Sequence, residues 1–305
     1  MKEDTEIQYN QIAEKLIKRY EREEGNSWKD NPMSLCQWMG SQAGNWSNAT
    51  WRLYKSAMIF YMQNHGPAET VKFLQGTLWK KKLKGDNKKT SQKKARRLSI
   101  SDLTQLLDKL QSSKGKYDAF IAKWLLSGLL VGIRPCEWHE AKIEDNALVL
   151  RNAKFNKDRS CGEFRRIHFQ ADKIEDLQTV IEFVQELSMM KLSKKEFIKL
   201  YEFCRRRLYS VNKMLWGERE LNICFYTTRH QFSANAKSTL DLISVAALMG
   251  HRSTDTATRN YLTKRYGDEN MIMVYPNHEN LMQVEDKFKM FANNQEKGEK
   301  TSRKN

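Results

Sequence analysis

The stretch YTTRHQFSANAKSTLDLISVAALMGHRSTDTATRNY, residues 226–261, decides how the second half of this 305-residue sequence is interpreted. Its pattern predicts three short helical segments in succession, at 228–237, at 242–249 and just before Tyr261. Arg229 falls in the first turn of the first segment, and His251 follows a glycine that can end the second. Such helix ends can direct polar groups at one anion. An arginine, a histidine and a tyrosine together fit attack by a tyrosine hydroxyl on a phosphodiester, because the first two bind oxygens while the tyrosine forms a covalent intermediate.

Composition favours a polyanionic partner. The formal net charge is +16, from 53 Lys and Arg against 37 acidic residues, and the pI is about 9.5. Nucleic acid is the first choice, although membrane surfaces and acidic proteins also bind basic proteins. Five scattered cysteines argue against a disulfide framework and against a zinc site. The polar N-terminus and the short apolar run at 124–133 predict a soluble, cytoplasmic protein without a membrane anchor.

Residues 1–78 are predicted to form a small helical domain, with helices near 6–24, 33–40, 49–64 and 67–78. Ser47 is a candidate N-cap for the third helix, which presents an apolar face and leaves Arg52 and Lys55 available to meet DNA phosphates. A linker follows at 79–98. Ten basic residues and one acid occupy its 80–97 part, which is interpreted either as a solvated tether or, preferably, as a strap along a DNA backbone. The linker lysines expected at phosphates are Lys88, Lys89, Lys93 and Lys94.

A second domain is predicted at 99–291, followed by a disordered tail at 292–305. A helix capped by Ser99 or Ser101 precedes a buried helix at 117–131, and further helices are expected at 171–189, 193–216 and 279–291. Strands at 147–153 and 163–169 form the predicted hairpin, with another short strand at 271–275. Arg134 follows the buried helix and needs an anionic partner, for which Glu137 is the candidate unless it orients Arg134 towards something else. The run of arginines at 205–207 is either a solvated face or a backbone contact.

Taken in order, these elements resemble the tyrosine recombinases, also called phage integrases. The resemblance is carried by GIRPCEW around Arg134, Lys154 in a hairpin, TTRH around Arg229, MGH ending at His251, and RNY ending at Tyr261. It covers the second domain, and the helix at 49–64 extends it weakly to the first. It implies a mainly α fold, with a helical core-binding N-terminal domain and a mostly helical catalytic domain that carries a small antiparallel sheet.

The resemblance also implies a reaction without metal or cofactor. Tyr261 would attack the scissile phosphate and leave a 3′-phosphotyrosyl bond, while Arg134 and Arg229 hold the non-bridging oxygens. His251 would hydrogen-bond the phosphate or assist proton transfer from the tyrosine. Lys154 would protonate the leaving 5′ oxygen.

The implied partners are double-stranded DNA recombination sites, two of which would be bound by four protomers, with accessory DNA-bending proteins as further partners. Integration, excision or resolution of a mobile element would be the outcome, and DNA binding would make the protein nucleoid-associated. A tyrosine-nucleophile topoisomerase and a non-catalytic DNA-binding protein are the alternatives.

Some positions depart from the family pattern or leave a choice open. Tyr226 stands where most relatives carry histidine, and it either donates a hydrogen bond to the phosphate or packs beneath the helix. Tyr261 lies ten residues after His251, where many relatives have nine. His230 is predicted to be structural, because neighbouring residues on a helix point about 100° apart. Lys157 is the alternative to the favoured Lys154 for the role at the cleavage site and is a predicted DNA contact.

Overall fold

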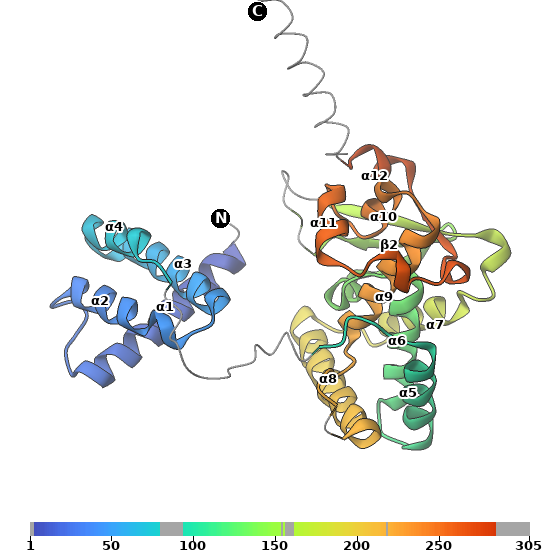
Figure 1. Cartoon of the computed structure of the whole chain (residues 1–305), viewed down its shortest axis with the longest axis horizontal. Helices are drawn as coiled ribbons and strands as arrows, with labels where there is room; N and C mark the ends of the chain where they lie inside the picture. Colours follow the sequence, from blue (N-terminus) through green and yellow to red (C-terminus); the bar gives the residue numbers. More distant parts are fainter. Residues whose placement is uncertain (1–2, 80–93, 154, 156–161, 218, 285–305) are drawn as a thin grey trace, which may run out of the picture. The chain divides into compact units, whose positions relative to one another are not determined.

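The computed structural model describes residues 3–79, 94–153, 155, 162–217 and 219–284 of the chain. The chain divides into two compact units, Met1–Lys89 and Thr90–Asn305. Figure 1 shows the first unit as helices only and the second as helices around a small sheet. None of the helices in the described ranges is long and apolar enough to cross a membrane.

The first unit contains the four helices expected from the sequence. They are α1 (Glu3–Glu24), α2 (Pro32–Gln42), α3 (Asn48–His65) and α4 (Ala68–Gly76), with a 3-10 turn at Ala43–Asn45. Ser47 caps α3 as predicted, accepting a hydrogen bond from the Thr50 N–H at 3.1 Å. The apolar face of α3 is buried through Trp51, Met58 and Met62, which pack with side chains of α1 and α2.

The second unit is built around α6 (Asp118–Val131), which packs against α5 (Ile100–Ser112), α7 (Gln178–Met189) and α9 (Phe225–Thr239). The N-cap of α5 is Ser99. The predicted capping box of Ser193 and Glu196 is confirmed at the start of α8 (Lys194–Trp216). The remaining helices are η3 (Pro135–Glu140), α10 (Leu242–Leu248), α11 (Thr254–Asn260) and α12 (His278–Met282). Short 3-10 turns lie at η4 (Ala171–Lys173), η5 (Lys264–Tyr266) and η6 (Glu269–Met271).

The sheet is antiparallel, in the order β1 (Lys142–Glu144), β2 (Ala147–Arg151), β3 (Phe164–Phe169) and β4 (Val274–Pro276). The predicted hairpin is confirmed as β2 and β3, in which Leu148 faces Ile167. Strand β1 was not predicted, because its three residues are too few to show an alternation of apolar and polar side chains. The predicted strand at 271–275 is displaced to β4, because η6 occupies the residues just before it.

Two predicted helix boundaries are wrong. The helix expected from 171 begins at Gln178, because its first residues form the η4 turn, a common element before a helix. The helix expected at 279–291 is the short α12, which ends at Met282, and residues 285–291 of that prediction lie outside the described residues. Neither error moves a candidate site residue.

Candidate active site

Four separate segments of the second unit bring Arg134, Arg229, His251 and Tyr261 together. Arg134 is the first residue after the α6 end loop and serves as N-cap of η3. Arg229 lies in α9, and His251 follows α10 through Gly250, whose φ of 64° suits glycine. Tyr261 is the C-cap residue of α11. All four residues are buried, with relative exposures of 9% or less.

Arg229 joins the ends of two helices. Its Nη1 donates to the carbonyl of Gly132, the C-cap residue of α6, at 2.7 Å, and its Nη2 donates to the carbonyl of Met249, the C-cap residue of α10, at 2.6 Å. A cation is favourable at both places because helix C-termini carry partial negative charge. The side chain is fully buried. Arg229 therefore helps to hold the unit together, in addition to any role towards a ligand.

The rest of the Arg229 guanidinium faces the candidate catalytic groups. Its Nε donates to the Tyr261 hydroxyl at 3.0 Å, and Nη2 also contacts His251 Nε2 at 3.3 Å. An arginine has five N–H donors. Four of them have partners in the described part of the chain, which leaves one on Nη1.

Arg134 is held differently. Its Nη1 donates to Glu137 Oε1 at 2.7 Å and its backbone N–H donates to Glu137 Oε2 at 2.7 Å. This confirms Glu137 as the anionic partner expected from the sequence. Within the described residues, the Nε and Nη2 groups of Arg134 have no hydrogen-bond partner, so most of its donors remain available to an anion.

Glu137 also binds a second arginine that sequence reasoning missed. Arg165, in β3, donates from Nη2 to Glu137 Oε2 at 2.7 Å and from Nη1 to Oε1 at 3.2 Å. Burial alone would raise the pKa of the Glu137 carboxyl, but Arg165, Arg229 and Arg134 hold that pKa far below its usual range. The carboxylate is therefore ionised and buried, and it binds two arginines at once.

Glu137 further fixes the base of the hairpin loop. Its Oε1 accepts a hydrogen bond from the Ala153 N–H at 3.2 Å. Asn152 closes the same loop by donating from Nδ2 to the Gly162 carbonyl at 2.9 Å, and its Oδ1 accepts from Arg165. Gly250 lies against this cluster, because a Cβ there would stand 2.6 Å from Asn152 Oδ1. The sheet and the loop that carries His251 are thereby packed together.

His251 is neutral. Its pKa lies well below the usual histidine value, first because of burial and then because of the nearby charges of Arg229, Arg134 and Arg165. Since Arg229 can only donate, the Nε2 atom of His251 accepts, and the ring proton is on Nδ1. This buried Nδ1 has no hydrogen-bond partner among the described residues.

Tyr261 is paired with Tyr226, the residue whose role the sequence left open. The two hydroxyl oxygens are 3.0 Å apart. His230 packs beside both rings, with centroid distances of 5.3 Å to Tyr226 and 5.0 Å to Tyr261. Burial, followed by the charge of Arg96, lowers the pKa of His230 to about 4, so this ring is also neutral. The His230 ring therefore forms part of the wall of the candidate site.

The pKa values of the two tyrosines shift in opposite directions. Burial raises the pKa of Tyr226, and the bond to Tyr261 adds to the rise. Burial would also raise the pKa of Tyr261, but Arg229 and the hydrogen bonds from Tyr226 and Arg229 outweigh it and lower that pKa. Because the Arg229 Nε can only donate, the Tyr261 oxygen accepts a hydrogen bond from it, and this contact favours the ionised form of Tyr261.

Other predicted residues are less informative. Lys154, Lys157 and three of the linker lysines lie outside the described residues, and the fourth linker lysine, Lys94, is exposed. In the first unit Arg52 is exposed, whereas the Lys55 ammonium donates to the carbonyls of Gln75 and Thr77 at 2.8 and 2.9 Å. Lys55 therefore also joins α3 to the end of α4.

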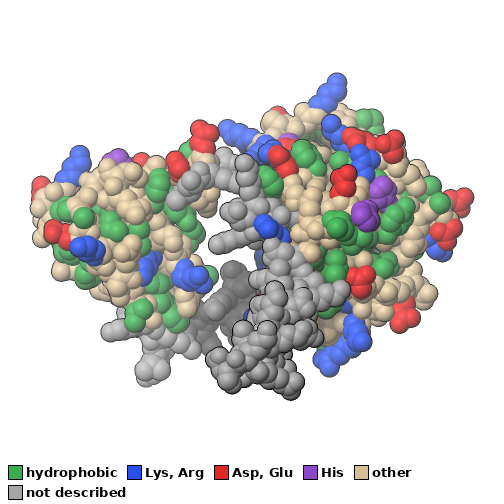
Figure 2. Space-filling model, turned by 90° about the horizontal axis from the view of Figure 1, so that it is seen from above, with side chains coloured by type: hydrophobic (Ala, Val, Ile, Leu, Met, Phe, Trp, Pro, Cys, Tyr) green, Lys and Arg blue, Asp and Glu red, His purple; other side chains and the backbone are tan. Residues whose placement is uncertain are grey.

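The arginine run at 205–207 is divided by its contacts. Arg205 pairs with Glu202 of its own helix. Arg207 pairs with the buried Asp118 at 2.7 Å, which gives it a structural role between α8 and α6. Arg206 is exposed. Among the residues that Figure 2 draws in colour, basic and acidic side chains are interspersed, and no single basic patch stands out.

Comparisons with known proteins concern the fold. No protein-family model matches the sequence, and no curated protein matches it. Solved structures similar to this chain include site-specific recombinases, and the mostly helical chain with its small antiparallel sheet agrees with the expected fold class.

In particular, XerH recombinase bound to difH substrate in a pre-cleavage complex has a TM-score of 0.46 and 17% identity, over 78% of this chain and 69% of that one. XerH bound to palindromic difH in a post-cleavage complex has a TM-score of 0.44 and 18% identity, over 73% and 66%. XerA recombinase has a TM-score of 0.36 and 14% identity, over 87% and 90%. At these identities, function must be inferred from the side chains of this chain itself.

Proposed function

We propose that this chain is a site-specific DNA recombinase that cuts and rejoins DNA through a 3′-phosphotyrosine at Tyr261. The observation that carries the proposal is the contact of the Tyr261 hydroxyl with Arg229 Nε at 3.0 Å, inside a buried cluster with two further phosphate-binding groups, Arg134 and His251. A tyrosine used only for packing does not need two arginines to lower its pKa.

In the cleavage step, the Tyr261 oxygen bonds to phosphorus and the bond from phosphorus to the 5′ oxygen breaks. The tyrosine loses its proton and the leaving oxygen takes one up, so the step is balanced in protons. Arg229 and Tyr226 stabilise the negative charge on the attacking oxygen before reaction. The 5′ hydroxyl of a partner strand then attacks the phosphotyrosine, which restores the phosphodiester and releases Tyr261.

Phosphate binding falls mainly to Arg134. Among the described residues, most guanidinium donors of Arg134 have no partner, whereas Arg229 has one such donor. The unpartnered Nδ1–H of His251 supplies a further donor to a non-bridging oxygen. Fixed donors of this kind stabilise the charge that shifts onto those oxygens in the transition state. This assigns His251 to hydrogen bonding with the phosphate and not to accepting the tyrosyl proton.

Lys154 is proposed as the acid that protonates the leaving 5′ oxygen, with Lys157 as the alternative. Support comes from the residue before it, because Ala153 donates its N–H to the same carboxylate that holds Arg134. The base of this loop and the main phosphate-binding arginine are therefore attached to one buried group.

The remaining parts of the proposal follow from the resemblance and from charge. The partner is a double-stranded recombination site, and four protomers act on two sites, with accessory DNA-bending proteins as further partners. The first unit and the linker lysines contact the DNA backbone, where the excess positive charge is favourable. The product is an integrated, excised or resolved mobile element, and the protein works in the cytoplasm at the nucleoid.

Covalent trapping tests the proposal. Duplexes are first selected from a random pool for binding to the purified chain and then nicked at successive positions, so that loss of a short fragment prevents religation. The wild-type chain should form an adduct that survives denaturing electrophoresis. Tyr261→Phe should form none while binding nearly as well, and Tyr209→Phe, the same change at an exposed tyrosine of α8, should keep the adduct.

An adduct that persists in Tyr261→Phe and maps to Tyr266 or Tyr209 would show that the nucleophile is wrongly assigned. Absence of any adduct with tight binding would favour a non-catalytic DNA-binding protein. Relaxation of supercoils without exchange between two sites would favour a topoisomerase.

A further inference from the structure

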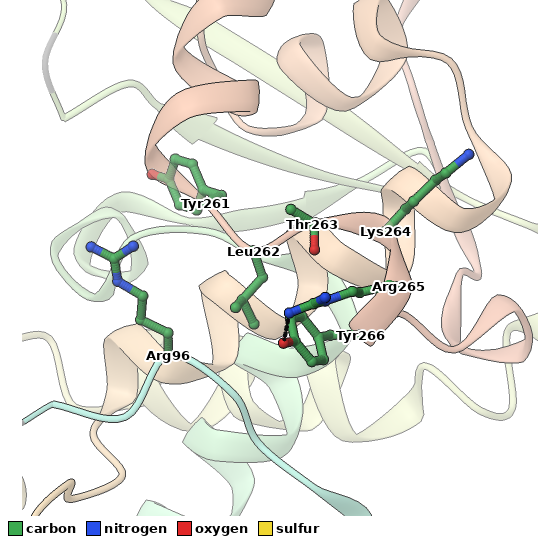
Figure 3. Close-up of a pocket in the computed structure, with 7 residues that line it drawn as sticks. All are labelled: Arg96, Tyr261, Leu262, Thr263, Lys264, Arg265 and Tyr266. Atoms are coloured by element: carbon green, nitrogen blue, oxygen red, sulfur yellow. Dashed lines mark hydrogen bonds between the residues drawn. The ribbon is translucent and has the colours of Figure 1, made fainter.

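A cavity of about 410 Å³ opens directly beside Tyr261. Figure 3 shows Tyr261 at its upper side, with the guanidinium groups of Arg96 and Arg265 on either side of Leu262, while Lys264 extends away. Thr263 and Tyr266 complete the lining. The contacts proposed for the attacked phosphate involve Arg134 and His251, neither of which lines this cavity.

The cavity has a fixed framework, because α9 holds both of the segments that form it. Thr227 donates to the Ala95 carbonyl at 2.7 Å, and Gln231 accepts from the Leu98 N–H at 3.1 Å, so the backbone on both sides of Arg96 is tied to α9. Gln231 also donates to the Tyr266 carbonyl at 2.6 Å. Gln231 therefore links the segment that carries Arg96 directly to the η5 turn.

The segment after Tyr261 is held equally closely. Lys237 donates to the Leu262 carbonyl at 2.8 Å. Gly267 lies so near α9 that a Cβ there would meet the backbone of Ala234 and Asn235, which only glycine avoids. The cavity is therefore bounded by segments whose backbones cannot separate without breaking these contacts.

Its charge is positive and uncompensated. No acidic residue lines the cavity, and within the described residues the Arg96 side chain has no ion-pair partner. Arg265 lies over the Tyr266 ring at 4.6 Å and Arg97 lies over the same ring at 5.3 Å, so two guanidinium groups are gathered at this wall. The lowered pKa of neighbouring His230, to which Arg96 contributes, reports the same positive potential.

The lining fits a sugar–phosphate better than a base. Guanidinium groups bind phosphate oxygens in forked geometry, and Leu262 offers an apolar surface to a sugar. A base would need a free aromatic face, but the Tyr266 ring is covered by arginine, and Arg229 and His230 lie against the Tyr261 ring. The volume lies in the lower part of the usual range for ligand sites.

We propose that the cavity formed by Arg96 and the η5 turn is a second phosphate-binding site, which takes the phosphodiester next to the attacked one on the cleaved DNA strand. The inference rests on the proposed function, because only a strand positioned for attack by Tyr261 would place its neighbouring phosphate there. Such a contact positions the strand without reading its sequence.

Neutral phosphates test this site. A methylphosphonate is placed at each phosphate flanking the nick in turn, and equilibrium binding and single-turnover adduct formation are measured for the wild type and for the Arg96→Gln, Arg265→Gln double variant. The double variant should bind unmodified DNA about tenfold more weakly and form the adduct on it about tenfold more slowly. At the phosphate next to the cleavage point, methylphosphonate should cost the wild type a similar factor and the double variant almost nothing.

Arg259→Gln is the matched control. It removes the same kind of charge from α11, where Arg259 is exposed, pairs with Asp255 and does not line the cavity. It should leave the methylphosphonate effect unchanged. The site is refuted if the losses caused by the double variant and by methylphosphonate multiply at every phosphate position. It is also refuted if Arg259→Gln abolishes the loss caused by methylphosphonate.

This outcome is separable from failure of the proposed function. If the wild type binds DNA but forms no adduct, the recombinase proposal fails, and the variants are compared through binding alone. Loss of the methylphosphonate effect in the double variant would then still support a phosphate site beside Tyr261. An unchanged effect would overturn it.

Discussion

Removing the Tyr226 hydroxyl should shift the pH dependence of cleavage to higher pH. In Tyr226→Phe the Tyr261 oxygen loses one of the two hydrogen bonds that lower its pKa, while Arg229 remains. The pKa of Tyr261 should therefore rise. Less of the tyrosine is then ionised near neutral pH, and cleavage should slow there.

The structure sets the size of this effect. A hydrogen bond to a charged group contributes about 1.5–3 kcal/mol, which corresponds to roughly a ten- to hundredfold loss of rate. The same free energy raises the pKa of Tyr261 by about one to two units. The rate should therefore rise with pH over a higher range in the variant than in the wild type, and the difference between them should shrink as pH increases.

Single-turnover adduct formation between about pH 6 and pH 10 measures this directly, a window that spans the ordinary tyrosine pKa. Thermal unfolding is recorded in parallel, because half-buried Tyr226 could also affect stability. Tyr201→Phe is the control, since it removes a hydroxyl from a half-buried ring that packs against Trp124 in the core and should leave the profile unchanged. Tyr226→His tests whether a donor at this position restores the neutral rate.

Two results would refute the reasoning. An equal loss at every pH would mean that Tyr226 contacts the phosphate and does not act on Tyr261. Parental kinetics with reduced thermal stability would mean that Tyr226 only packs beneath the helix.

Three further predictions address other parts of the chain. Replacing the four linker lysines with glutamine should weaken binding to all DNA sequences alike and reduce the salt slope by roughly one for each phosphate that is no longer neutralised, whereas a solvated tether would leave the slope unchanged. Lys154→Ala should slow cleavage sharply, and a 5′-bridging phosphorothiolate, whose leaving group needs no acid, should restore much of the rate; rescue of Lys157→Ala instead would reverse the assignment. The pKa of His230 is lowered to about 4 in the folded chain, so between about pH 6.5 and pH 4 the unfolded chain binds more protons than the folded one. The free energy of unfolding should therefore fall as pH falls through this window, by up to about 1.4 kcal/mol per pH unit from this residue. Thermal unfolding of His230→Gln should show a shallower pH dependence, and an unchanged one would contradict the buried neutral histidine.

Local signals in the sequence were sufficient for most helices and for the pairing of Arg134 with Glu137. Ser47 and Ser193 mark helix starts through side-chain caps that depend on neighbouring residues only. The pairing of Arg134 with Glu137 could be predicted for the same reason, since three residues separate them. Such interactions are encoded within one turn of chain.

Interactions across the fold could not be predicted in the same way. Arg165 shares an inward strand face with Ile167 and Phe169, so its burial could have been read from the alternation, but its bond to Glu137 joins residues 28 apart. The bond between Tyr226 and Tyr261 depends on how α9 packs against the segment after α11. No local pattern specifies either distance.

The bonding of Arg229 has a consequence for the spacing of reactants. The plane of its guanidinium group is fixed at two helix ends by the carbonyls of Gly132 and Met249, and its Nε already binds the hydroxyl of Tyr261, the proposed nucleophile. A phosphate oxygen that accepts the one remaining Nη1 proton would be bound to the same rigid, flat group. The separation between attacking oxygen and phosphate would then depend on bond lengths within a single side chain, and small movements of the surrounding helices would carry both reactants together.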